Sequence, residues 1–288
     1  MNNLDLKGIL PVNKPQGWTS FDVVNKIKHI IYQKGLKIGH LGTLDPMATG
    51  VLLVTVGKAT KLFDLMQQKS KTYLATFEFG YETDTLDATG TKVSESLNLP
   101  TRQQIEEILP SFIGQIEQMP PKYSAKSING KRAYDLARAN QQFDLKPCKV
   151  NIYDLDIIDF SKNCLTLKVV CGSGTYIRAI GRDIAEKLKT YATMTSLIRT
   201  DIDNFNIKNC VDIQSINEQN IAENMFKIKN VLSQPVLKLG QTETGKILNG
   251  QSVKIEKDDG LYQLIGENDT IALVQIKDFN AKMSIFLA

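Results

Sequence analysis

Residues 39–50, GHLGTLDPMATG, form the part of this sequence whose residue types best suit chemistry. Three glycines, a proline and two threonines predict a tightly turned loop in which the backbone can approach a ligand closely. The loop carries one imidazole, His40, and one carboxylate, Asp45. A carboxylate can act as a nucleophile or as a base. Taken alone, Asp45 could equally cap the turn before Pro46, so its neighbours must decide between these roles.

Other kinds of site lack the residues that they need. Two histidines leave few candidates for a Ser-His-Asp triad, and four cysteines without a CxxC pair argue against structural zinc. The spacing near Gly57 does not fit a P-loop, the interval from Asp84 to Gly90 does not fit an EF-hand loop, and Gly172-x-Gly174 is only a fragment of a dinucleotide fingerprint. We therefore expect no metal and no cofactor, and chemistry that rests on carboxylates, tyrosines and arginines.

Regular elements are predicted on both sides of this loop. A helix that begins after a Thr19 or Ser20 cap has apolar residues at helical spacing, namely Phe21, Val24, Ile27 and Ile31. Residues 51–56 are a short apolar run that is typical of a strand buried on both faces. Residues 72–79 alternate as a strand with Tyr73 on its apolar side.

The later part of the chain alternates between strands and helices. Thr101 and Gln104 form a capping box that opens a helix ending at Pro110. Residues 165–171 alternate as a strand, which leads through a glycine turn into a helix beginning near Ile177. The pattern predicts an α+β fold centred on a large mixed sheet. We expect a catalytic domain over residues 1–230, with an inserted segment around 115–145, and a small β-rich module over 231–288.

The positive charge is unevenly distributed. Residues 1–200 hold 26 Lys and Arg against 19 Asp and Glu, whereas residues 201–288 carry a net charge of −3. Such a bias suits a polyanionic partner, although a solvated basic face is the simpler explanation when charge is considered alone. The start of the chain lacks the features of a signal peptide, and no stretch approaches the ~20 apolar residues of a membrane span. We expect a cytoplasmic protein with no membrane partner.

Several segments together resemble the TruB family of tRNA pseudouridine synthases, which modify the uridine at position 55 in the T-loop. The GHLGTLDPMATGVL segment around Asp45 is the most specific of them. The other segments follow in matching order: Asn13-Lys14-Pro15-x-Gly17-x-Thr19-Ser20, Lys71-Thr72-Tyr73, Asp84-Thr85-x-Asp87-x-x-Gly90, Pro120-Pro121-x-Tyr123-Ser124-Ala125 and Gly174-Thr175-Tyr176-Ile177-Arg178. The resemblance runs through nearly the whole chain, and it implies a shortened PUA-like module at the C-terminal end.

The resemblance implies roles for individual residues. Asp45 matches the catalytic aspartate, Tyr73 the tyrosine that stacks on the target base, and Arg178 the arginine that pairs with the aspartate. Further positions are expected to bind the substrate: His40, Tyr176, Leu197, Lys14, Lys122, Lys126, Lys131 and Arg132. Without the matching segments, Tyr73 would be assigned to core packing and Arg178 to the surface.

This residue set suits the isomerisation of uridine, which breaks the N1–C1′ bond, turns the base and rejoins it through C5. Asp45 could add covalently or remove a proton from the sugar, and both routes stay open. A base buried in a folded T-loop must first be flipped out. The expected partner is the T-arm of tRNA, and the expected state is a monomer. Two alternatives remain: an RNA chaperone that binds T-loops without catalysis, and a hydrolase of N-glycosidic bonds.

Overall fold

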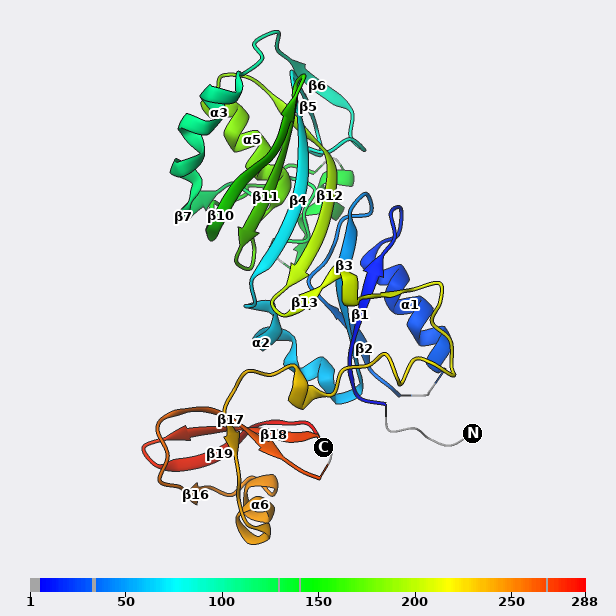
Figure 1. Cartoon of the computed structure of the whole chain (residues 1–288), viewed down its shortest axis with the longest axis vertical. Helices are drawn as coiled ribbons and strands as arrows, with labels where there is room; N and C mark the ends of the chain where they lie inside the picture. Colours follow the sequence, from blue (N-terminus) through cyan, green and yellow to red (C-terminus); the bar gives the residue numbers. More distant parts are fainter. Residues whose placement is uncertain (1–5, 33–34, 129, 140, 268) are drawn as a thin grey trace.

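The computed structural model describes residues 6–32, 35–128, 130–139, 141–267 and 269–288. Two sheets organise this part of the chain, a large sheet of ten strands and a C-terminal sheet of five strands (Figure 1). Two hairpins add short two-stranded sheets, β5–β6 and β8–β9. Helices pack beside the large mixed sheet, so the predicted α+β class and the β-rich C-terminal module are confirmed.

The large sheet brings together strands that lie far apart in the sequence. Its order is β14-β1-β3-β12-β4-β11-β10-β7, with β2 paired to β3 and β13 paired to β12. The strand bounds are β1 Gly8–Lys14, β2 Ile38–Leu41, β3 Thr49–Val56, β4 Lys71–Phe79, β7 Gly114–Gln118, β10 Cys148–Ser161, β11 Cys164–Cys171, β12 Ala192–Ile202, β13 Phe205–Asn206 and β14 Val211–Asp212. Strand β12 lies parallel to β3 and antiparallel to β4. It therefore joins the part of the sheet beside Asp45 to the strand that carries Tyr73.

The strands around β4 form the larger apolar core, against which α5 (Ile177–Lys187) and α3 (Arg102–Ile108) pack. Burial alternates along β4, as its sequence predicts, with Tyr73, Phe77 and Phe79 on the buried side. Helix α5 comes very close to this strand, because a Cβ added to Gly181 would lie 2.2 Å from the ring of Phe77. Helix α3 begins with the predicted Thr101 capping box and continues into a 3₁₀ turn, Leu109–Phe112.

A second core lies between β1, β3 and α1 (Ser20–Ile31). The predicted helix and its cap are confirmed: Thr19 Oγ1 accepts a hydrogen bond from the backbone N–H of Asp22, and the Asp22 carboxylate accepts one from the backbone N–H of Thr19. Of the apolar residues noted at helical spacing, Val24 and Ile27 are buried, whereas the Phe21 side chain is 60% exposed with the Lys28 ammonium above its ring. The buried face is completed by Ser20 and Val23.

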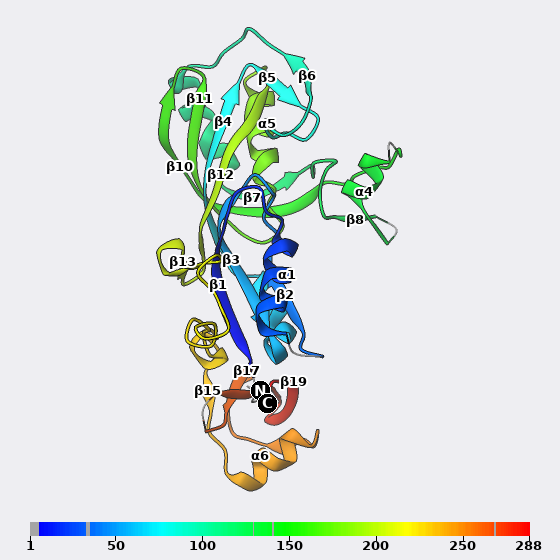
Figure 2. The ribbon, with the colours of Figure 1, turned by 90° about the vertical axis from the view of Figure 1, so that its right-hand side faces the viewer.

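A segment between β7 and β10 projects from the body of the molecule (Figure 2). It contains β8 (Ser127–Ile128), β9 (Lys131–Arg132) and α4 (Ala133–Arg138), and we call residues 120–146 the projecting segment. Figure 2 shows this segment on the same side of the large sheet as α1, whereas β13 lies on the other side. Short elements with few buried residues make it the least packed part of the chain around the large sheet.

The C-terminal sheet has the order β15-β17-β18-β19-β16. Its elements are β15 Val236–Leu237, α6 Gln241–Leu248, β16 Val253–Lys254, β17 Gly260–Ile265, β18 Thr270–Lys277 and β19 Asn280–Phe286. The sheet docks firmly, because Leu273 and Leu287 share an apolar cluster with Leu62 of the 3₁₀ helix Gly57–Leu62. The Asp269 carboxylate also accepts hydrogen bonds from the backbone of the 3₁₀ helix Ile228–Asn230. The module is therefore held in a defined position.

Candidate active site

The loop between β2 and β3, residues 42–48, presents Asp45 beside the middle of the large sheet. The backbone N–H of Ala48 donates to the Asp45 carbonyl at 3.0 Å, which closes a tight turn. Gly42 and Gly50 bound the turn with φ of 85° and 108°, values that favour glycine. Gly50 has a second constraint, because a Cβ there would lie 2.2 Å from the Arg199 carbonyl oxygen. The sequence thus turns sharply at two glycines and leaves the Asp45 side chain 33% exposed.

Arg178, in the first turn of α5, grips the Asp45 carboxylate with two nitrogens. Its Nε lies 2.9 Å from Oδ2, and its Nη2 donates to Oδ1 at 3.2 Å. The guanidinium is 9% exposed and also donates to the carbonyl of Thr85 at 2.8 Å and to that of Tyr123 at 2.9 Å. A planar guanidinium held at four points is a rigid partner that orients a carboxylate as well as attracting it.

Asp87 approaches Arg178 from the other side, with its Oδ2 3.5 Å from Nη1. Its second oxygen accepts from the hydroxyl of Thr85 and from both the backbone N–H and the hydroxyl of Thr89. Only 6% of the Asp87 side chain is exposed. Asp87 is thus a carboxylate near the site whose oxygens are already occupied, which leaves Asp45 as the accessible one of the pair.

Burial raises the pKa of Asp45 above its ordinary value, and the nearby Asp87 charge adds to this rise. Arg178 opposes both by its positive charge and by its hydrogen bond. Burial favours the neutral acid, and the Arg178 guanidinium favours the carboxylate. The relative size of these two effects sets the ionisation of Asp45 at neutral pH. Any loss of Arg178 would therefore push the pKa of Asp45 still higher.

Tyr73 and Leu197 form an apolar wall next to this loop. Their side chains are 8% and 6% exposed, and both belong to the core cluster that also includes Leu44. Burial raises the pKa of Tyr73. The ring packs in the same apolar cluster as Leu44, the residue before Asp45. The phenol is consequently neutral at pH 7, and its ring is available for apolar contact.

The turn between β1 and α1 holds the loop from one side. Ser20 Oγ accepts from the backbone N–H of Leu44 at 2.9 Å, and Gly17 N–H donates to the Pro46 carbonyl at 2.8 Å. Lys14 is fully buried, and its ammonium donates to the carbonyls of Pro15, Trp18 and Pro46. Burial lowers the pKa of Lys14 to about 8, against an opposing effect of the Asp45 charge. This arrangement favours a positioning role for Lys14 over the direct substrate contact predicted from sequence.

Arg199 holds the same loop from the other side, and our sequence analysis did not single it out. It is 1% exposed, and its guanidinium donates to the carbonyls of Val51, Gly42 and Thr43 at 2.7, 3.0 and 3.4 Å. Its Cζ also lies 6.0 Å from the centre of the Tyr73 ring. Little in the sequence signals this, because β12 also contains threonines, a serine and an aspartate, so Arg199 does not stand out as a buried charge.

His40 and Tyr176 lie at the edges of this arrangement. His40 is on β2, where its Nδ1 is buried without a hydrogen-bond partner among the described residues. Burial and the Arg199 charge lower the pKa of His40, so its imidazole is neutral at pH 7. Tyr176 is the residue before α5, and its side chain is half-buried.

The predicted RNA-facing cations lie on or beside the projecting segment. Lys122, Lys131 and Arg132 are exposed. Lys126 is half-buried, and its ammonium donates to the Lys146 carbonyl at 3.0 Å, which closes the base of the segment. Lys122 and Lys131 can therefore meet an anionic partner directly, whereas Lys126 and Arg132, which donates to the Ala125 carbonyl at 2.7 Å, are also part of the local structure.

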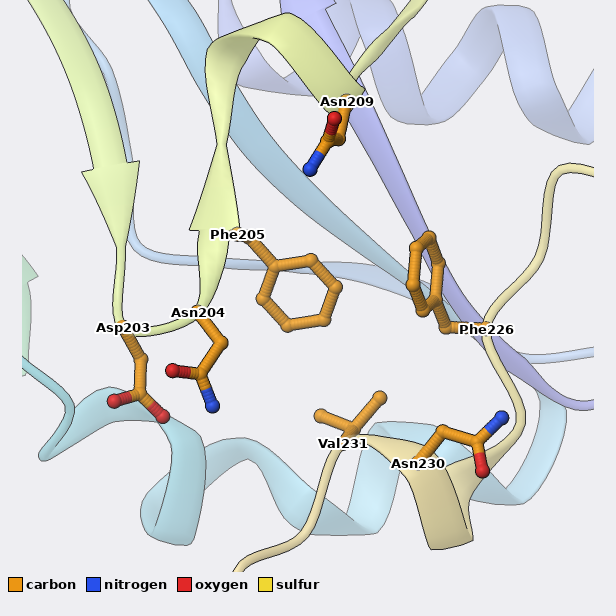
Figure 3. Close-up of a pocket in the computed structure, with 7 residues that line it drawn as sticks. All are labelled: Asp203, Asn204, Phe205, Asn209, Phe226, Asn230 and Val231. Carbon is orange, nitrogen blue, oxygen red and sulfur yellow. The ribbon is translucent and has the colours of Figure 1, made fainter.

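A separate small hollow of about 80 Å³ lies on the other side of the sheet (Figure 3). It is lined by Asp203, Asn204, Phe205, Asn209, Phe226, Asn230 and Val231. Phe205 and Phe226 meet edge to face there at 5.3 Å. None of the predicted site residues lines this hollow, so it is distinct from the arrangement around Asp45.

Two other features were sought in the described part of the chain. No group of three or more His, Cys, Asp or Glu side chains comes together there in a way that could hold a metal ion. None of the described helices is long and apolar enough to cross a membrane.

Comparison with known proteins places this geometry in a family. Residues 28–177 match the model of the TruB family pseudouridylate synthase N-terminal domain. The tRNA pseudouridine synthase B of Clostridium kluyveri is 41% identical over 287 residues, which cover 96% of this chain and 98% of that protein. The protein of the same name from Fusobacterium nucleatum is 39% identical over 282 residues, with 96% and 97% coverage.

A crystal structure of a Cbf5-Nop10-Gar1 complex contains a chain of the same fold, with a TM-score of 0.73 at 20% identity, covering 98% of this chain and 85% of that one. Fold and sequence together thus define a class of enzyme, the pseudouridylate synthases. The chain belongs to the TruB family.

Proposed function

We propose that this enzyme converts uridine to pseudouridine at position 55 in the T-loop of tRNA, with Asp45 as the essential catalytic carboxylate. The observation that carries the proposal is the two-point contact between Arg178 and a partly exposed Asp45, on a loop whose Leu44 packs in the same apolar cluster as Tyr73. The tRNA substrate and its T-arm are inferred from the relatives named tRNA pseudouridine synthase B, which are similar along nearly the whole chain.

The roles of the residues follow from their contacts. Arg178 orients Asp45 and keeps it ionised by opposing the effect of burial on its pKa. The neutral Tyr73 ring and Leu197 provide an apolar surface on which a flipped base can stack, which keeps water from a detached uracil. His40 and Tyr176 are assigned to T-loop contacts at the edges of the site. The exposed cations Lys122, Lys131 and Arg132 would meet the RNA backbone.

Unmodified tRNA made by transcription provides the deciding experiment. The RNA is incubated with the protein and labelled with a carbodiimide that remains attached to pseudouridine, and reverse transcription then locates the label. The proposal predicts a single labelled position, 55, located by the stop of reverse transcription. It also predicts that the mass of the RNA, measured before labelling, does not change. If RNA treated with the wild-type protein carries no label at position 55, the proposal is refuted.

The same samples separate the two alternatives. A hydrolase of N-glycosidic bonds would release free uracil, and it would need a second free carboxylate. The nearby Asp87 is buried, its Oδ1 accepts hydrogen bonds from Thr85 and Thr89, and its Oδ2 pairs with Arg178, which disfavours that mechanism. An RNA chaperone acting without catalysis predicts that Asp45→Asn keeps the biological effect of the protein, and this activity could coexist with isomerisation.

A further inference from the structure

The N-terminus of α5 lacks the features that normally stabilise a helix start. Tyr176, the residue at the N-cap, makes no capping hydrogen bond with its side chain, and the first turn contains no acidic residue. Instead the first turn carries a cation, Arg178, at the end of the helix where the backbone dipole disfavours positive charge. Something outside the helix must therefore hold this end in place.

The side-chain amide of Gln118 binds this end of the helix. Its Oε1 accepts from the backbone N–H of Tyr176 at 2.8 Å, and its Nε2 donates to the carbonyl of the same residue at 3.2 Å. An amide is a neutral group that can accept from the N–H and donate to the carbonyl of one residue simultaneously. Gln118 is 1% exposed and ends β7, so its own position is set by the pairing of β7 with β10.

The chain that enters α5 would otherwise be free to adopt several conformations. It arrives from Gly172-Ser173-Gly174, where Gly174 has a φ of 81° and a Cβ would meet no atom within 4 Å. A glycine turn in open space does not determine the direction of the following helix. The contact with Gln118 comes directly after this turn and two residues before Arg178.

We infer that Gln118 is a positioning residue, which fixes the first turn of α5 and thereby the placement of Arg178 against Asp45 and of Tyr176 beside the site. The inference rests on the proposed function. It adds a residue that makes no hydrogen bond to the Asp45 carboxylate and that holds the backbone N–H and carbonyl of Tyr176.

Gln118→Met removes both hydrogen bonds and keeps most of the side-chain volume. The matched control is Gln263→Met in the C-terminal sheet, because Gln263 is also buried and donates to two carbonyls, those of Leu232 and Gln234. We expect both variants to lose thermal stability. Only Gln118→Met should slow pseudouridine formation in a single turnover, by about 10–100-fold, because a small misplacement of a catalytic group is costly. Its dissociation constant for tRNA should change little.

The pH dependence separates positioning from a general loss of stability. A displaced Arg178 opposes the burial of Asp45 less, so the acid limb of the single-turnover rate should move to higher pH in Gln118→Met and stay in place in Gln263→Met. A ¹³C NMR titration of the Asp45 carboxyl, assigned with Asp45→Asn, should show the same upward shift in protein without RNA. That measurement needs no activity, so it tests Gln118 even if the proposed reaction fails. Gln118→Met with an unshifted carboxyl titration and an unshifted pH profile would overturn the inference.

Discussion

The Asp45 loop is fixed by many hydrogen bonds, whereas the projecting segment extends from the body of the molecule with few of its residues buried (Figure 2). The loop is fixed by Lys14, Ser20, Arg199 and Arg178 through hydrogen bonds to its backbone or its carboxylate. The projecting segment consists of short elements, and its base is closed by Lys126. Chemistry needs a group held within a fraction of an ångström, whereas a charged surface that docks RNA does not.

The two regions meet at Arg178. Its Nη2 donates both to Asp45 and to the carbonyl of Tyr123, at the start of the projecting segment. The rigid and the loosely packed region therefore share one guanidinium. If the contrast between them is correct, substitutions at the loop should affect catalysis and stability, and substitutions on the projecting segment should affect RNA affinity.

The largest effect is expected from Asp45→Asn, which should lower pseudouridine formation by at least about 10³-fold. The loss is confined to chemistry, so tRNA binding should remain. Burial raises the pKa of Asp45, which means that the folded state disfavours the carboxylate relative to the unfolded chain. The melting temperature at pH 7 should therefore be no lower than in the wild type. Turnover above about one tenth of the wild-type rate would contradict the assignment of Asp45.

Arg178→Met should reduce the rate roughly 10²-fold at pH 7, because it removes the charge that opposes burial of Asp45. The pKa of Asp45 then rises, so less of the enzyme is ionised at pH 7 and the rate should recover in part as the pH is raised. Measuring the rate as a function of pH shows whether the pKa of Asp45 rises, as expected, in Arg178→Met. Arg178→Lys retains the charge without the two-point contact and serves as the control, with a smaller shift of the acid limb.

Arg199→Met and Arg132→Met compare the two regions directly, since both arginines donate to backbone carbonyls. Arg199 is buried, and its loss leaves the carbonyls of Val51 and Gly42 without this donor. We expect a decrease of roughly 1–3 kcal/mol in the free energy of unfolding. Arg132 is exposed, so Arg132→Met should lower the free energy of unfolding by less than about 0.5 kcal/mol. If urea titrations give equal losses of unfolding free energy for the two variants, the two regions do not differ in the proposed way.

Replacing Lys122, Lys131 and Arg132 by glutamine should leave the single-turnover rate at saturating tRNA nearly unchanged and weaken tRNA binding. The slope of log affinity against log salt concentration should decrease by about 0.7–0.9 for each phosphate contact removed. The matched control replaces Lys162, Lys187 and Lys189, which are exposed outside the projecting segment. An equal change of slope in the control would show that only net charge matters.

Much of the local structure could be predicted because it depends on neighbouring residues. The cap at Thr19, the capping box at Thr101 and the alternation along β4 are confirmed. Strand β10 was missed because register shifts near Ile152 and Ile157 interrupt the alternation that would have marked its 14 residues as a strand. In α1, Val24 and Ile27 are buried as their spacing indicates, whereas Phe21 is exposed, because contact with β1 and β3 decides which apolar residues of the helix are covered.

The order of residues alone determined the tight turn around Asp45, the helix that carries Arg178 and the alternating strand that carries Tyr73, because periods, caps and glycine turns act over a few residues. Only the tertiary structure decided that Lys14 donates to the Pro46 carbonyl, that Arg199 holds the loop from across the sheet, and that Gln118 binds the backbone of Tyr176. These contacts join positions 32, 157 and 58 residues apart. No local preference encodes such pairs, because they exist only once the strands between them have been brought into one sheet.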